Sequence, residues 1–308
     1  MESHNNFHQI GIGFCGSVWS PAQDPNKTSA FKREDGGPGR SLFNDFTMHK
    51  RAIEGLRRLA DLNSTNSSAG LAPPAQIPYC HRLIEASDTW WETNLQNFPT
   101  GYSPCTVLHT ERIPPLPQKA REFLIDRYCP DSGKKVIKAD INNKDCLVRA
   151  YLGRRRFSNA KSRFFSLRNF PLHLDQMEDI GVNITLYAAM IADALAALHW
   201  YAAIDVNDVE FVIAPPRLEP TRSLTSNVFG DHTLWLLDFD CCKDMSMDEK
   251  GVEQAVEAFF KNDPFYPRPG QPLWDLFRNQ YLQTSTIILG GKSRLPGLFI
   301  EKVEGLKK

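Results

Sequence analysis

The sequence predicts an α+β protein of two lobes, with a small β-rich N-lobe over residues 1–117 and a mainly helical C-lobe over residues 118–308. Three observations support this prediction. Short alternating strands around glycines open the chain, a long apolar helix is expected over residues 183–203, and two acid-bearing strands follow it. The chain is 42% hydrophobic, which suffices for a sizeable core.

The N-lobe begins with strands and continues into one helix. FHQIGIGFCGSVWS (7–20) and SAFKRE (29–34) predict strands separated by turns. SLFNDFTMHKRAIEGLRRL (41–59) has apolar residues at helical spacing, with Ser41 as its cap. After a polar connector, residues 77–86 and 105–113 predict two further strands. We place the lobe boundary at the extended PPLP, near Pro117.

In the C-lobe the sequence predicts a helix over 118–130 and a mixed segment over 134–150. NITLYAAMIADALAALHWYAA (183–203) is apolar nearly all round, which favours a buried helix. After the acid-bearing strands, helices are expected over about 249–260 and over 273–285, with a proline-rich loop between them.

Composition excludes several classes of protein. Lys plus Arg and Asp plus Glu number 36 each, so no overall field favours nucleic acid or a membrane. Seven cysteines without a C-x-x-C pair argue against a disulfide framework. We see no secretory signal and no apolar run of 18 residues, and therefore expect a cytoplasmic protein without a membrane partner. The cysteines and histidines at 80, 81, 105, 109 and 129 lack the spacing of a zinc site, which favours buried free cysteines.

A glycine-rich element and a lysine suggest phosphate binding in the N-lobe. Gly11, Gly13 and Gly16 fit G-x-G-x-x-G, whose backbone N–H groups approach phosphate oxygens without Cβ obstruction. Lys32 lies on the next strand, where a protein kinase carries its phosphate-pairing lysine. Turn geometry alone also explains the glycines, and a solvated lysine also explains Lys32. Asp45 and Glu54 are candidate partners of Lys32, although ordinary exposed helix acids explain both.

The acid-rich segments add to this protein-kinase-like layout. In AIDVNDVEFVI, Asp205 falls at the catalytic aspartate, and in LWLLDFD, Asp238 falls at the metal-binding aspartate of D-F-G. The sequence departs from the kinase pattern at two acidic positions. Glu210 stands in place of the metal-binding asparagine, and Asp240 stands in place of the glycine of D-F-G. Extra carboxylates repel phosphates, which favours a degenerate or repurposed kinase fold. Each acid is alternatively a capping or salt-bridged carboxylate, and for Asp208 this explanation is preferred.

A second stretch, GRRRFSNAKSRFFSLRN (153–169), combines basic and aromatic residues without an acid. Basic side chains bind phosphates and aromatic rings stack on unpaired bases, so the stretch suits single-stranded or looped RNA. A solvated basic face with inward phenylalanines is the alternative. The candidate tRNA-binding residues are Arg154, Arg155, Arg156, Lys161, Arg163 and Arg168.

Together, YLGRRR, FFSLRNFPL, DVNDVEFV and LWLLDFD resemble a fungal family labelled as a zinc finger protein of unknown function, similar to the arginine-containing cyclodipeptide synthases. The resemblance implies a cytoplasmic enzyme that joins arginine from arginyl-tRNA with a residue from a second aminoacyl-tRNA into a cyclo(Arg-Xaa) diketopiperazine. It implies both tRNAs as partners, no DNA, and neither cofactor nor metal.

The hypothesis assigns roles to the acids. Asp205 and Glu210 are the expected catalytic residues, with Asp205 accepting a proton from the attacking α-amine and Glu210 also clamping the arginyl group. The expected substrate-binding residues are Asp238, Asp240, Lys32, Gly11, Gly13 and Gly16. Two rivals stay open: a small-molecule phosphotransferase of kinase-like fold, and a non-catalytic pseudokinase scaffold.

Overall fold

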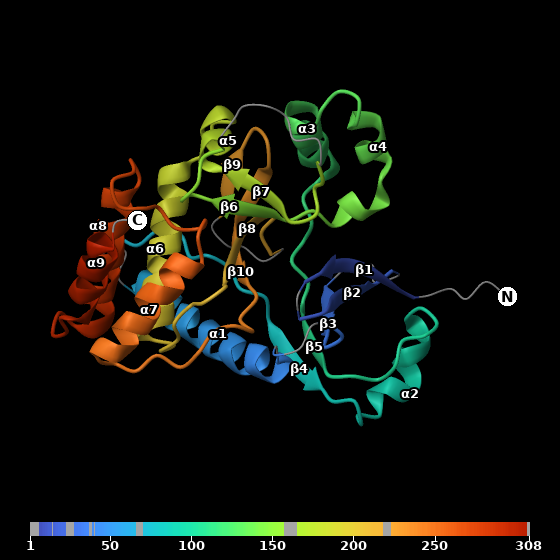
Figure 1. Ribbon diagram of the computed structural model, residues 1–308, viewed down its shortest axis with the longest axis horizontal. Helices are drawn as coiled ribbons and strands as arrows, with labels where there is room; N and C mark the ends of the chain where they lie inside the picture. The colour runs from blue at the N-terminus through green and yellow to red at the C-terminus, as the bar shows by residue number, and fades with distance from the viewer. Residues whose placement is uncertain are drawn as a thin grey trace.

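The structure is a computed structural model that describes residues 6–13, 15–22, 28–36, 39, 41–65, 70–156, 165–217 and 223–306. It confirms the α+β class. Two five-stranded sheets occupy opposite parts of the molecule, and helices gather mainly around the second (Figure 1). Within these described ranges, no helix has the length and apolar character needed to cross a bilayer.

The first sheet is antiparallel throughout and contains the predicted N-lobe strands. Its spatial order is β1 (Phe7–Ile12), β2 (Ser17–Pro21), β3 (Ser29–Arg33), β5 (Val107–Glu111) and β4 (Cys80–Ile84). Lys32 pairs in register with Val18 on one side and Leu108 on the other. This register holds Lys32 in the middle of the sheet, where neighbouring strands fix its backbone.

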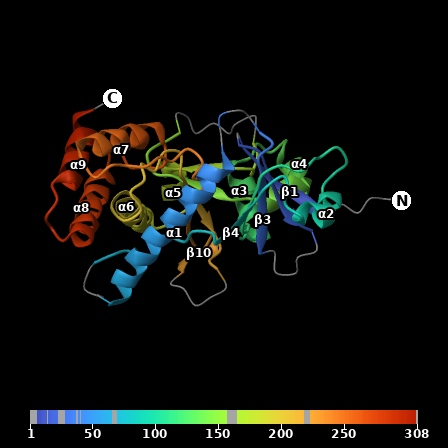
Figure 2. The same cartoon turned by 90° about the horizontal axis from the view of Figure 1, so that it is seen from below.

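The two faces of the first sheet are covered by different helices. The long helix α1 (Leu42–Thr65) packs on one face, and α2 (Trp90–Asn94) with η1 (Leu95–Asn97) packs on the other, as both ribbon views show (Figures 1 and 2). Because side chains alternate along a strand, Lys32 faces the α1 side, whereas Phe31 and Arg33 face the α2 side.

The second sheet has the order β7 (Phe170–His173), β6 (Val148–Tyr151), β8 (Glu210–Ala214), β10 (Gly230–Leu237) and β9 (Leu224–Ser226). Strands β6 and β7 are parallel, and the other pairs are antiparallel. Leu237 at the end of β10 pairs with Glu210 at the start of β8. Asp238, the next residue, therefore lies at the same end of these two strands as Glu210.

Helix α6 (Ile184–Trp200) forms the centre of the largest core, as its apolar sequence predicts. Asn183 caps it by accepting a hydrogen bond from the backbone N–H of Leu186 at 3.0 Å. The remaining helices are α3 (Gln118–Tyr128), α4 (Lys134–Ala139), η2 (Ile141–Asp145), α5 (Leu174–Asp179), α7 (Glu249–Lys261), α8 (Trp274–Leu289) and α9 (Leu295–Gly305). The sequence did not predict α2, α4, α5, α9, β6, β7 or β9.

Two segments join the halves of the molecule. Helix α1 buries Ala52 and Leu56 in the same core cluster as α6. Farther along, Gln76 exchanges backbone hydrogen bonds with Leu234 and Leu236 of β10, each at 2.8 Å. The chain before Pro117 therefore contributes to the packing of both sheets, and the predicted division into domains at residue 117 stays a prediction.

Candidate functional site

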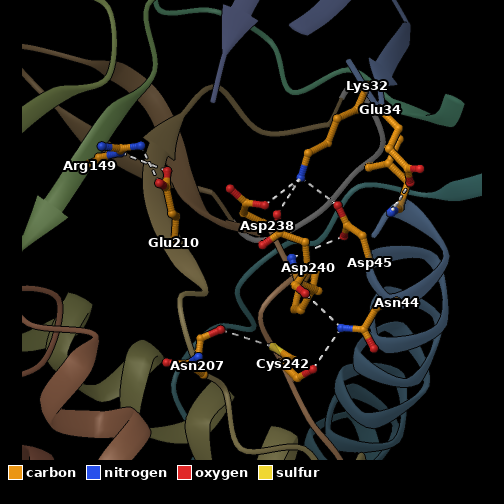
Figure 3. Close-up of polar contacts among 12 residues, drawn as sticks. Lys32, Glu34, Asn44, Asp45, Arg149, Asn207, Glu210, Asp238, Asp240 and Cys242 are labelled. Carbon is orange, nitrogen blue, oxygen red and sulfur yellow. Dashed lines mark hydrogen bonds and ion pairs between the residues drawn. The ribbon is translucent and has the colours of Figure 1, made fainter. Parts of the chain in front are cut away.

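A network of ion pairs around Lys32 lies where β3, α1 and the end of β10 meet (Figure 3). The Nζ atom of Lys32 is 2.7 Å from an Asp45 oxygen and 2.6 Å from an Asp238 oxygen. An oxygen of Asp240 lies 3.9 Å away. Burial alone would lower the pKa of Lys32, but the three carboxylates outweigh it and hold that pKa well above its ordinary value. Lys32 is therefore a fixed cation held among three carboxylates.

Asp45 is the acid of α1 that reaches Lys32, and it is 2% exposed. The preference for an ordinary exposed acid at this position was wrong. Its second oxygen accepts a hydrogen bond from the backbone N–H of Phe239 at 3.2 Å. Glu34 caps the first turn of α1 by accepting from the N–H of Leu42 at 2.8 Å, which fixes the start of the helix. Asp45 thus ties β3 to the segment after β10.

The neighbouring Asn44 holds the same segment from its side chain. Its Nδ2 donates to the backbone oxygens of Asp240 and Cys242, both at 2.9 Å (Figure 3). Asp238, just before, has a positive φ of 69°, an uncommon conformation for a residue with a Cβ. The segment that carries Asp238 and Asp240 is therefore held in a strained path by α1.

Asp205 does not take part in the network around Lys32. It is 4% exposed and accepts from the backbone N–H groups of Lys243 at 2.9 Å and Asn207 at 3.2 Å, and from Gln254 Nε2 of α7 at 2.8 Å. These bonds position the loop before β8, where Val206 adopts a φ of 59° that is strained for a β-branched residue. The role of Asp205 as a proton acceptor stays a prediction.

Glu210 is paired with Arg149 of β6, to one side of the Lys32 network (Figure 3). The guanidinium binds both carboxylate oxygens, with one Nε–Oε2 distance of 2.9 Å. Burial raises the pKa of Glu210 to about 7, against the opposing effect of Arg149. Glu210 was predicted to clamp the guanidinium of a substrate, whereas in the structure it holds one from the protein itself. Arg149 was not predicted as a site residue, because it lies in a segment without clear periodicity.

The glycine-rich element forms the turn between β1 and β2. Gly13 N–H donates to the Gly16 carbonyl at 2.9 Å, and Gly16 has a φ of 151°. A Cβ at Gly16 would lie 2.0 Å from the Arg33 carbonyl oxygen, so only glycine fits there. Gly11 and Gly13 have ordinary space around them. Cys15 is 3% exposed, packs against α1, and has its pKa raised to about 12 by burial, so it is no nucleophile.

The basic stretch is largely paired within the described part of the chain. Arg154 binds Asp263, Arg155 binds Glu178, and Arg156 binds Asp175. Arg168 is exposed, whereas Lys161 and Arg163 lie outside the described residues. Phe165 packs on Phe170 with ring centroids 5.4 Å apart. Any RNA phosphate at Arg154–Arg156 would compete with carboxylates already in place.

Comparison with known proteins gives one family and corrects the resemblance proposed above. Residues 234–293 match the family model DUF3669, described as "Zinc finger protein". Nothing found indicates a cyclodipeptide synthase family, so the resemblance to the fungal arginine-containing cyclodipeptide synthases was wrong. No curated protein matches the chain.

The matched segment does not contain the ligands of a zinc finger. It has no histidine and two adjacent cysteines, Cys241 and Cys242, whereas a structural zinc site takes four cysteine or histidine ligands. Cys242 is 1% exposed in the core. In the described parts of the chain, one group of potential ligands is close together, with atoms of Asp208, Asp240 and Cys241 all within 4.8 Å.

Proposed function

We propose that the site around Lys32 binds a magnesium nucleotide and that the protein is a small-molecule phosphotransferase of kinase-like fold. The observation that supports this is the lysine of β3 held at 2.7 Å by an acid of α1 and at 2.6 Å by the aspartate after β10. Kinase-like enzymes assemble a strand lysine, a helix acid and a metal-binding aspartate in this way.

The residues present fit such a ligand. Magnesium prefers carboxylate oxygens, and Asp238 and Asp240 offer them beside Lys32. Asp45, Asp238 and Asp240 gather their carboxylate oxygens around Lys32, so a bound cation would find several oxygen ligands at one place. The metal, when bound, supplies positive charge to the phosphate oxygens.

The remaining residues take positioning roles. Lys32 would contact phosphate oxygens, with Asp45 holding it in place. Asp205 fixes the loop before β8 through two backbone N–H groups and Gln254. Glu210 is the first residue of β8. Its ion pair with Arg149 holds the Glu210 carboxylate toward β6.

The test is a thermal-shift experiment with ATP and Mg²⁺. At about 100 times Kd, binding adds about 2.7 kcal/mol, which raises Tm by several degrees for a chain of this size. Lys32→Arg keeps the positive charge among the carboxylates but changes the geometry, and should abolish the shift. Lys135→Arg, at an exposed lysine of α4, is the matched control. An absent shift, or one that Lys32→Arg leaves intact, rejects the proposal. Binding without any phosphoryl transfer favours the pseudokinase scaffold.

A second candidate is the tRNA-dependent joining of arginine and another amino acid into a cyclo(Arg-Xaa) product. Two observations favour it: the pKa of Glu210 near 7 suits a group that accepts protons at neutral pH, and the carboxylates gathered around Lys32 suit an amine or guanidinium. This second candidate rests only on the residues around Lys32 and Glu210. The ion pairs of Arg154–Arg156 do not favour it, because they leave less positive charge for tRNA.

Mass spectrometry of the medium from an expressing bacterial host separates the two candidates. The synthase predicts a cyclo(Arg-Xaa) mass that Glu210→Gln removes and Lys135→Arg retains. A host that expresses folded protein and releases no such product rejects the second candidate and leaves the first unaffected.

A further inference from the structure

Arg33 follows Lys32 on β3 but points to the opposite face of the sheet. Its strand partner Val107 and its neighbour Phe31 both belong to the aromatic cluster under α2. Arg33 is 2% exposed, and its guanidinium lies 5.1, 4.6 and 4.9 Å from the ring centres of Trp91, Phe98 and Tyr102. A charge buried so completely needs strong polar partners.

The guanidinium has two hydrogen bonds and one nitrogen without any. Its Nε donates to Asp35 at 2.9 Å, and its Nη2 donates to the Ser103 carbonyl at 2.7 Å. Its Nη1 is buried and has no hydrogen-bond partner among the described residues. Leaving a buried charged donor without an acceptor is costly, so an oxygen that reached this nitrogen would gain a strong hydrogen bond.

Arg33 lines an open cavity of about 530 Å³ on the α2 side of the first sheet. One wall is the glycine-rich turn, and the other is the loop at residues 100–103. The polar side chains of the lining include those of Gln9, Ser17, Arg33, Asp35, Tyr102 and Ser103. The volume matches a small metabolite, and glycines and hydroxyl groups let polar ligand atoms approach the backbone closely.

The charge of Asp35 does not block an anion here. Its oxygens accept from the Ser17 N–H at 2.7 Å, from the Ser17 hydroxyl at 2.8 and 3.0 Å, and from Arg33 Nε. These donors already disperse its negative charge. The unpartnered Nη1 is a different nitrogen of the same guanidinium, so an oxygen bound there would not displace any of these bonds.

We propose that this cavity is a second ligand site, separate from the Lys32 site, for a small molecule that carries a phosphate or carboxylate group. An oxygen of that group accepts a hydrogen bond from Arg33 Nη1. The site is independent of the proposed phosphotransferase activity, because it lies on the other face of the sheet.

Isothermal titration with inorganic phosphate and, separately, with acetate tests the proposal and distinguishes the two oxygen sources. Both titrations are repeated on Lys32→Arg, so that binding at the Lys32 site is recognised. Arg33→Gln should weaken binding by about tenfold or more, as expected for the loss of a charged hydrogen bond. Replacing the buried Arg33 can itself disturb folding, so Thr100→Trp provides a second test. Thr100 is an exposed residue of the cavity lining, and a tryptophan there should occupy part of the cavity and weaken binding without unfolding the protein.

We expect at least one of the two anions to bind. This binding should persist in Lys32→Arg and should be lost in Thr100→Trp or in Arg33→Gln. Absence of binding for both anions overturns the proposal. So does binding that a folded Arg33→Gln and Thr100→Trp leave unchanged, or binding that disappears with Lys32→Arg alone. The ATP thermal shift tests the Lys32 site separately, so failure of this proposal and failure of the phosphotransferase proposal are told apart.

Discussion

Removal of Arg149 should destabilise the protein through the carboxylate that it leaves behind. Arg149 and Glu210 form a two-point ion pair whose side chains are 24% and 16% exposed. Breaking one partner of a buried pair costs about 3–5 kcal/mol, and we take about 3 kcal/mol because this pair is only partly buried. Arg149→Met should therefore lower the free energy of unfolding by about 3 kcal/mol at pH 8, measured by urea denaturation.

The loss of stability in Arg149→Met should depend on pH. Burial raises the folded-state pKa of Glu210 to about 7, above its ordinary 4.5, so stability falls as pH rises between these values. Without Arg149 the carboxyl group holds its proton to still higher pH, and the destabilisation at pH 6 should be smaller than at pH 8. The double variant Arg149→Met with Glu210→Leu should recover to within about 1 kcal/mol of the wild type. Equal losses at both pH values, or a double variant as unstable as the single one, would refute this reasoning.

Four further outcomes are expected. Asp193 on α6 accepts from Ala72 N–H and the Gln280 and Thr284 side chains, so Asp193→Ala should cost about 2–4 kcal/mol in urea denaturation. Burial raises its pKa to about 6, so stability should fall as pH rises from about 4 to 6, and Asp193→Asn should flatten that slope. Gly16→Ala should lower stability by about 2 kcal/mol or more, whereas Gly13→Ala should change it by under about 1 kcal/mol, and equal losses would contradict the steric argument. EDTA should leave Tm unchanged, since the matched segment lacks zinc-finger ligands, and a fall of several degrees would reveal a structural metal.

The parts of the fold that the sequence predicted are those with strong local signals. Residues 183–203 are apolar all round, and α6 covers Ile184–Trp200. The glycines before Lys32 predicted the hairpin that β1 and β2 form. By contrast, β6 and β7 have four residues each and pair in parallel with each other, so no hairpin turn joins them. Such strands have no local turn signal and form only when the rest of the sheet is present.

For the candidate site, too, only the features with a local sequence signal were predicted. Lys32 and Asp238 were predicted together from two short motifs, and they lie 2.6 Å apart. That Asp45 would be buried, and that Glu210 would already have a guanidinium partner, depended on which residues α1 and β6 bring near. Charge pattern alone cannot tell a carboxylate that awaits a ligand from one that is satisfied within the protein.

Helix α1 gives the site a cooperative character. Asn44 and Asp45 are adjacent on its first turns, and between them they contact β3, Phe239, Asp240 and Cys242. A rigid outward displacement of this helix would sever all of those contacts in a single step. Lys32, Asp238 and Asp240 would then lose their alignment together, so the centre is held as one unit by the position of a single helix.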